Sequence, residues 1–121
     1  MKIRTCLFLS GFVLAAACKN EQAVAPASVD GKFDCNVALV TTSYVYNVVT
    51  ANCTSRGCHR AGGSDFSTAD KLKSYISASR AVFTQRVTSA QATMPPSRFP
   101  ALSQGTKDSI ACWIEKGMPD K

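Results

Sequence analysis

The stretch CTSRGCH at positions 53–59 decides how the rest of the chain is interpreted. It contains two cysteines separated by four residues, and the second cysteine is followed directly by a histidine, His59, the only histidine in the sequence. Two thiols and an imidazole this close together favour a covalent cofactor site, a metal site or a local disulfide.

Covalent attachment of a c-type haem requires this set of side chains. Two thiols add across the porphyrin vinyl groups, and the adjacent imidazole reaches the iron from the same side. The usual interval between the cysteines is two residues, whereas Cys53 and Cys58 are separated by four. The longer interval can bulge outward if the backbone turns, and Gly57 permits such a turn. The alternative is a Cys53–Cys58 disulfide with a solvated histidine beside it.

The residues before the motif predict a helix. In TTSYVYNVVTANC, apolar side chains recur at helical spacing (Val45, Val48, Val49 and Cys53), although the many β-branched residues would also suit a strand. A helix ending at Asn52 would turn one apolar face toward whatever the motif binds.

The residues after the motif predict two more helical segments. Ser67 and Thr68 form a helix start, followed by the stripe Leu72, Tyr75 and Ile76. A second short helix is expected from Arg80 to Val87, with Val82, Phe83 and Val87 on one side.

The C-terminal part combines a stiff loop with the clearest helix of the chain. The stretch MPPSRFPAL contains three prolines and cannot form a regular helix. The final helix should begin at the N-cap Ser103 and stop at Gly117, with Pro119 behind it. These elements predict an all-α domain that is too small to be stable through its own core alone, which favours a buried cofactor.

The N-terminal segment is typical of an exported lipoprotein. Lys2 and Arg4 precede an apolar run, and small residues precede Cys18, as in a signal peptide over residues 1–17. LAAAC at positions 14–18 resembles a lipobox, with Ala15 where a leucine is usual, so we expect a lipid on Cys18. The apolar run is too short to cross a hydrocarbon core about 30 Å thick. Residues 18–32 should form a flexible tether, and residues 33–121 the domain.

Charge and compartment restrict the partners. Removing Lys2 and Arg4 leaves 12 basic residues against 8 acidic ones. A modest basic excess could steer the domain toward anionic lipid or an acidic redox partner of the cell envelope, and an ordinary solvated surface is an equal explanation. Nucleic acid is not an expected partner in that compartment, and the protein is expected to be a monomer.

The stretch from Thr42 to Asp120 resembles the small class I cytochrome c domains of bacterial envelope proteins, above all those with a longer cysteine interval. The similar features are a helix leading into NCTSRGCH, a GGSDF turn, KLKSY, RV, the MPPS loop and LSQGTKDSIACWIEKGMPD. The resemblance implies a small helical fold that encloses one haem, and a terminal helix that crosses the first one with an aromatic residue, Trp113, at the contact.

The resemblance also implies the remaining site residues. The methionine before the prolines, Met94, would be the second axial ligand opposite His59. A thioether is a soft ligand, and a loop stiffened by prolines can hold it at a fixed distance. Met118 is the competitor, and core packing is the alternative for either methionine. A basic residue before Val87 suggests Arg86 as a partner of a haem propionate, although a solvated surface is the ordinary role of an arginine.

The other cysteines can be used to check the haem hypothesis. If Cys6 is removed with the signal peptide, Cys18 carries lipid, and Cys53 and Cys58 hold haem, then Cys35 and Cys112 remain as a natural disulfide pair. Two disulfides without a cofactor are the alternative. A zinc site is less favoured, because it needs thiolates in an oxidising compartment.

The function that follows is one-electron transfer by a haem with His59 and Met94 as axial ligands. With both axial positions filled, the domain would be a carrier and not an enzyme. The alternatives are a disulfide-stapled binding or structural lipoprotein, and a haem enzyme or gas sensor with a weak sixth ligand.

Overall fold

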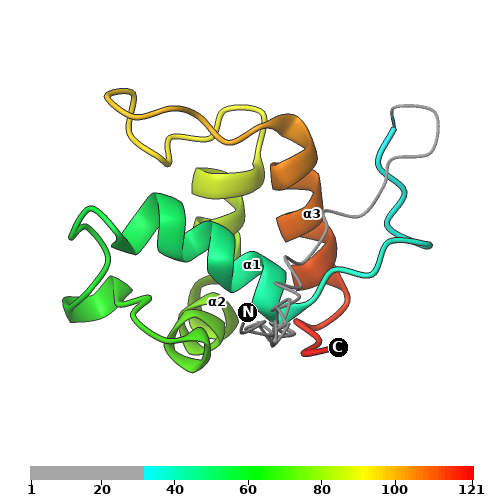
Figure 1. The fold of residues 1–121 in the computed structure, drawn as a ribbon, viewed down its shortest axis with the longest axis horizontal. Helices are drawn as coiled ribbons and strands as arrows, with labels where there is room; N and C mark the ends of the chain where they lie inside the picture. Colours follow the sequence, from blue (N-terminus) through cyan, green and yellow to red (C-terminus); the bar gives the residue numbers. More distant parts are fainter. Residues whose placement is uncertain (1–31) are drawn as a thin grey trace, which may run out of the picture.

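The computed structural model describes residues 32–121, and within this range the chain is helical and forms no strand. The helices are α1 (Thr42–Val49), α2 (Ala69–Phe83) and α3 (Gln104–Glu115) (Figure 1). Three short helical turns lie between them: η1 (Thr50–Thr54), η2 (Gly62–Ser64) and η3 (Thr84–Thr88). The all-α prediction is therefore confirmed for the described range.

The predicted signal peptide, the lipid on Cys18 and the tether up to residue 31 lie outside the described residues. In the part of the chain that the structure describes, no helix is long and apolar enough to cross a membrane.

All three helices begin at a hydroxyl N-cap. The side chains of Thr41, Thr68 and Ser103 accept hydrogen bonds from backbone N–H groups in the first helical turn, at 3.2–3.3 Å. Each cap satisfies one of the N–H groups that a helix start leaves without a partner. The predicted starts at Thr68 and Ser103 are confirmed.

The predicted end of the first helix at Asn52 is wrong. Helix α1 continues directly into the π-helical turn η1, so that Cys53 lies inside helical backbone. The hydroxyls of Thr54 and Ser55 donate to the carbonyls four residues earlier, at 3.3 and 2.7 Å, and thereby occupy acceptors at the helix end. Side-chain hydroxyls thus support the last turn, which the apolar spacing does not reveal.

Helix α2 contains the predicted helix from Thr68 and merges with the predicted short helix after it. Ser79 departs from helical geometry, with φ −137° and ψ 38°, and divides α2 into two parts. Phe83 on the second part is buried and Val87 is half-buried, as expected. Val82, expected on the same side, is 43% exposed, because consecutive residues of a helix point about 100° apart and Phe83 is the one that faces the core.

The proline-rich segment 89–103 forms a long loop without helix between η3 and α3 (Figure 1). Helix α3 then ends as predicted: Gly117 has φ +81°, and its N–H donates to the carbonyl of Ile114 at 3.1 Å. A left-handed glycine after the last turn is the common way to stop a helix.

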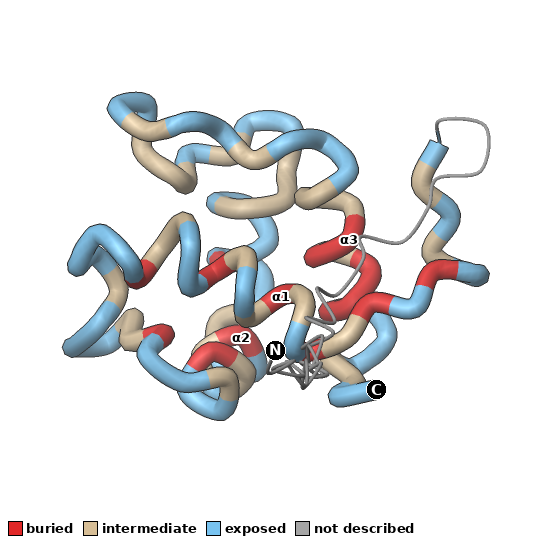
Figure 2. The backbone as a smooth tube through the Cα atoms, viewed as in Figure 1, coloured by how far each residue is buried: buried red, intermediate tan, exposed pale blue. Residues whose placement is uncertain are grey.

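The core lies among the three helices, whose inner faces carry most of the buried residues (Figure 2). Trp113 of α3 is completely buried, as is Val45 of α1, and the two helices contact each other. The Trp113 indole N–H lies 3.3 Å from Oγ1 of Thr42 and 3.1 Å from the carbonyl of Pro119. The predicted crossing of the first and last helices is therefore present, with the tryptophan at its centre.

A disulfide joins Cys35, in the segment before α1, to Cys112 of α3. The side chain of Lys116 donates to the carbonyl of Ala38 at 3.0 Å and holds the same segment against α3. Cys53 and Cys58 are not in a disulfide.

Candidate functional site

A cavity of about 240 Å³ lies between the end of α1, the end of α2 and the proline-rich loop. Its walls are mainly apolar and include Val49, Phe66, Phe83, Val87, Leu102 and Ile110. Most of these side chains also belong to the core or pack against it. The residues that line the cavity include no Asp or Glu, and its charged side chains are arginines. The cavity therefore suits a largely apolar group that carries negative charge at its edge.

The cysteine and histidine side chains of the motif all line this cavity. Cys53 is positioned by η1, and the chain then turns at Gly57, where φ is +76°. The N–H of His59 donates to the carbonyl of Cys53 at 3.0 Å, which brings the histidine back beside the first cysteine. The four-residue interval thus folds as a closed loop with both ends at the cavity.

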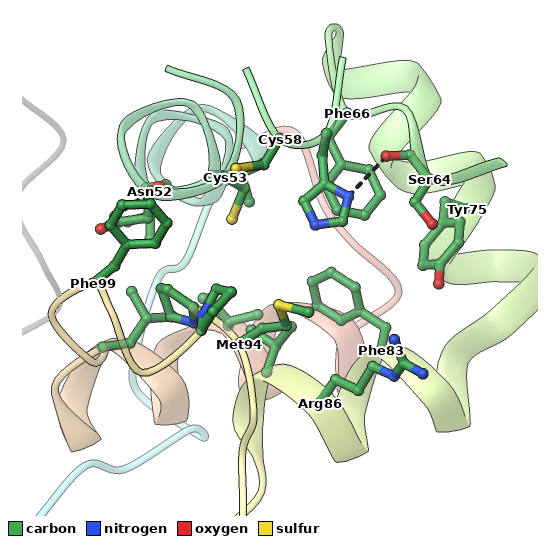
Figure 3. Close-up of a pocket in the computed structure, with 18 of the residues that line it drawn as sticks. Asn52, Cys53, Cys58, Ser64, Phe66, Tyr75, Phe83, Arg86, Met94 and Phe99 are labelled. Carbon is green, nitrogen blue, oxygen red and sulfur yellow. Dashed lines mark hydrogen bonds between the residues drawn. The ribbon is translucent and has the colours of Figure 1, made fainter. Parts of the chain in front are cut away.

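The imidazole of His59 is fixed in orientation by two contacts. Its Nδ1 lies 3.0 Å from the carbonyl oxygen of Ser64, drawn as a dashed line in Figure 3. Because a carbonyl can only accept, this contact favours the tautomer of the neutral ring in which Nδ1 carries the hydrogen and Nε2 the lone pair. The ring also stacks on Phe66, with centroids 4.7 Å apart and planes at 17°. A histidine held in this way is prepared to ligate a metal through Nε2.

Met94 lies on the opposite side of the cavity from Cys53 and Cys58 (Figure 3). The backbone N–H groups of Thr93 and Met94 both donate to the carbonyl of Arg86, at 3.0 and 2.8 Å. The π-helical turn η3 therefore holds the start of the proline-rich loop and the methionine on it.

The competing methionine, Met118, does not line the cavity. It packs against the core next to α3, and its N–H donates to the carbonyl of Trp113 at 2.8 Å. Of the two methionines weighed as ligands, the structure brings only Met94 together with the cysteine motif.

The arginines near the cavity and the cysteine motif make different contacts. Arg86 and Arg98 line the cavity, and both are exposed. Arg60 instead donates through Nε to the carbonyl of Thr54 at 2.7 Å, and Arg56 lies over the ring of Phe99. Arg86 remains a suitable partner for a carboxylate at the cavity edge.

The thiol of Cys53 is protonated at neutral pH. Burial, and secondarily the neighbouring Cys58, raise its pKa from 9.0 to about 11. Within residues 32–121, no cluster of three or more His, Cys, Asp or Glu side chains is arranged to hold a metal ion by itself.

The sequence did not reveal the two groups that orient His59. Ser64 and Phe66 belong to the GGSDF turn, and the N–H of Phe66 donates to the carbonyl of His59 at 2.9 Å. The sequence does show a turn close to the histidine, but it does not show which atoms of that turn face the His59 ring.

No protein-family model, no curated protein and no solved structure matches this chain.

Proposed function

We propose that the chain is a one-electron carrier of the small class I cytochrome c type, which holds one haem c covalently. Cys53 and Cys58 would form the thioether bonds, and His59 and Met94 would be the axial ligands. The observation that carries the proposal is that these four side chains, from two separate segments, line one apolar cavity.

The side chains of the cavity fit such a group. The thiols and Met94 lie on opposite sides (Figure 3), and His59, oriented by Ser64, keeps Nε2 free for a metal. The apolar walls exclude water from a flat apolar ring, and Arg86 offers a guanidinium to a propionate. Haem bound there would supply a reversible one-electron change at its iron. With His59 and Met94 filling both axial positions, no position remains for a substrate, which favours a carrier over an enzyme.

The state of the cysteines supports attachment. Each thiol would add across one vinyl group, with sulfur bonding to one carbon and hydrogen to the other, so the addition needs no oxidant. It needs both thiols to be reduced, and Cys53 and Cys58 are both free. Cys35 and Cys112 are already bonded to each other and do not compete.

The proposal includes the cell location that the sequence predicts. Residues 1–17 would direct export, Cys18 would carry the lipid, and residues 18–32 would tether the domain to the membrane. Cys18→Ser should move the exported protein from the membrane fraction to the soluble fraction without changing its haem content. Equal membrane association of the variant would contradict the lipid anchor.

Covalent attachment is tested on protein produced together with haem-attachment machinery. The parent should stain for haem on a denaturing gel, and mass spectrometry should find the peptide with positions 53–59 modified. The variant Cys53→Ala/Cys58→Ala should not stain, whereas Cys35→Ala/Cys112→Ala should. A colourless parent with four oxidised cysteines would instead support a disulfide-stapled lipoprotein.

The sixth ligand is tested by comparing the two methionines. Met94→Ala should abolish the weak far-red absorption band that reports iron–thioether contact, and Met118→Ala should preserve it. An unchanged spectrum in Met94→Ala would exclude Met94 as the ligand.

A further inference from the structure

The residues inside the cysteine interval form an ordered loop at the mouth of the cavity. The N–H of Gly57 donates to the carbonyl of Thr54 at 2.9 Å, and the same carbonyl accepts Nε of Arg60 at 2.7 Å. Thr54 is itself buried. None of the residues 54–57 lines the cavity, so the extra length of the interval is not used to contact its contents.

The side chain at the tip of this loop reaches the proline-rich loop. The guanidinium carbon of Arg56 lies 4.3 Å from the centre of the Phe99 ring. Phe99 lines the cavity and is held in a turn by its N–H, which donates to the carbonyl of Pro96 at 2.8 Å. The contact therefore joins the loop between the two cysteines to the loop that carries Met94.

The Arg56 guanidinium contacts the ring of Phe99. Among residues 32–121, the two ion pairs do not involve Arg56, and no hydrogen bond of its guanidinium is present. Arg98 also lies over the same ring, at 4.9 Å. A planar guanidinium stacks on an aromatic face in a way that a lysine ammonium does not, so the contact depends on arginine at this position.

We propose that the widened Cys53–Cys58 interval places Arg56 on Phe99 to hold the Met94 loop closed over the cavity. Arg56 is then a positioning residue for the sixth ligand: it touches neither the cofactor nor Met94, and it acts through Phe99. The inference rests on the proposed function. The Arg56–Phe99 contact would give a structural role to the two residues by which this interval exceeds the usual length.

The test measures how easily Met94 is displaced in the holoprotein. Imidazole is titrated into the oxidised parent and the variants, and loss of the far-red band gives the dissociation constant. In Arg56→Ala the loop opens more readily, and imidazole should bind about twofold to fivefold more tightly, as expected for an exposed cation–π contact. Arg56→Lys should recover only part of the difference. Arg80→Ala, which removes an exposed arginine of α2, is the control for charge and should match the parent.

A double-mutant cycle with Phe99→Leu shows whether Arg56 acts through the ring. In the Phe99→Leu background, Arg56→Ala should have no further effect on imidazole binding. Equal constants for Arg56→Ala and Arg80→Ala, or an undiminished effect in the Phe99→Leu background, would overturn this inference while haem attachment stands. A parent without covalent haem would overturn the proposed function and this inference with it.

Discussion

Removing the Cys35–Cys112 disulfide should cost a large part of the stability of the domain. The bond joins residues 77 positions apart and closes a loop that contains almost the whole described fold. In the chain-entropy model, a loop of this length corresponds to about 4.5 kcal/mol of unfolding free energy, and native disulfides in small exported domains typically contribute about 2–5 kcal/mol. Cys112 is only 2% exposed, so loss of its buried sulfur adds to the destabilisation. We expect Cys35→Ala/Cys112→Ala to lose about 3–5 kcal/mol.

The assay is urea unfolding of the holoprotein, followed by helical circular dichroism and by emission of Trp113, the only tryptophan. The parent treated with a thiol reductant is the control for the bond alone, and it should lose slightly less stability than the variant because it keeps the buried sulfur of Cys112. If the protein carries haem as proposed, the haem content should be unchanged in both, because Cys35 and Cys112 do not line the cavity. A loss below about 1 kcal/mol would refute the assignment of this disulfide as the main covalent support of the fold.

Three further predictions concern single positions. The pKa of the Asp65 carboxyl is lowered from 3.8 to about 2, mainly by its hydrogen bond with Lys71. The ionised carboxylate therefore stabilises the fold fully above about pH 4, and this stabilisation is lost as the pH falls toward 2. Asp65→Asn should flatten the pH dependence of the unfolding free energy between these two values. In the haem-free chain at pH 8, only about one in a thousand Cys53 thiols is ionised, because its pKa is about 11. An alkylating reagent should therefore modify the exposed Cys58 first, as measured by peptide mapping. Equal alkylation rates for the two cysteines would contradict the burial of Cys53. Trp113→Phe removes the indole donor to Thr42 and Pro119 and leaves unfilled space at a completely buried position, so it should lower the unfolding free energy by about 2 kcal/mol, measured by circular dichroism.

Features set by neighbouring residues could be predicted from the sequence. The N-caps Thr68 and Ser103 and the glycine stop at Gly117 depend on hydrogen bonds within one or two turns, and the structure has all three. The meeting of α1 and α3 near Trp113 was implied by the family resemblance, since an apolar stripe alone predicts burial but does not say against which helix.

Three features near the cavity could not be predicted in this way, although they too involve residues that are close in the sequence. The extension of α1 through Cys53 depends on hydroxyls that replace ordinary helix-end partners. The apolar stripe of this segment suits either Val82 or Phe83 as the buried residue, and only the packing of α2 shows that Phe83 is buried and Val82 is exposed. The orientation of His59 depends on a carbonyl oxygen of the following turn, and every residue type has such an oxygen. The same residues could also adopt other local arrangements, so only the fold shows which one forms.

The cavity and the core share their walls, so a group that filled the cavity would also affect the stability of the fold. Val49, Phe66, Phe83 and Ile110 belong to the core cluster and also line the cavity. Wall atoms that face an unfilled space lose van der Waals contacts on that side, so a group that fills the cavity completes the packing of the core. A reversible ligand would stabilise the fold by an amount that falls about 1.4 kcal/mol for each tenfold dilution. A covalently attached haem would not be lost on dilution. The unfolding free energy of the pigmented protein should therefore be independent of protein concentration, and a concentration-dependent value would show that the cofactor is held without the thioether bonds.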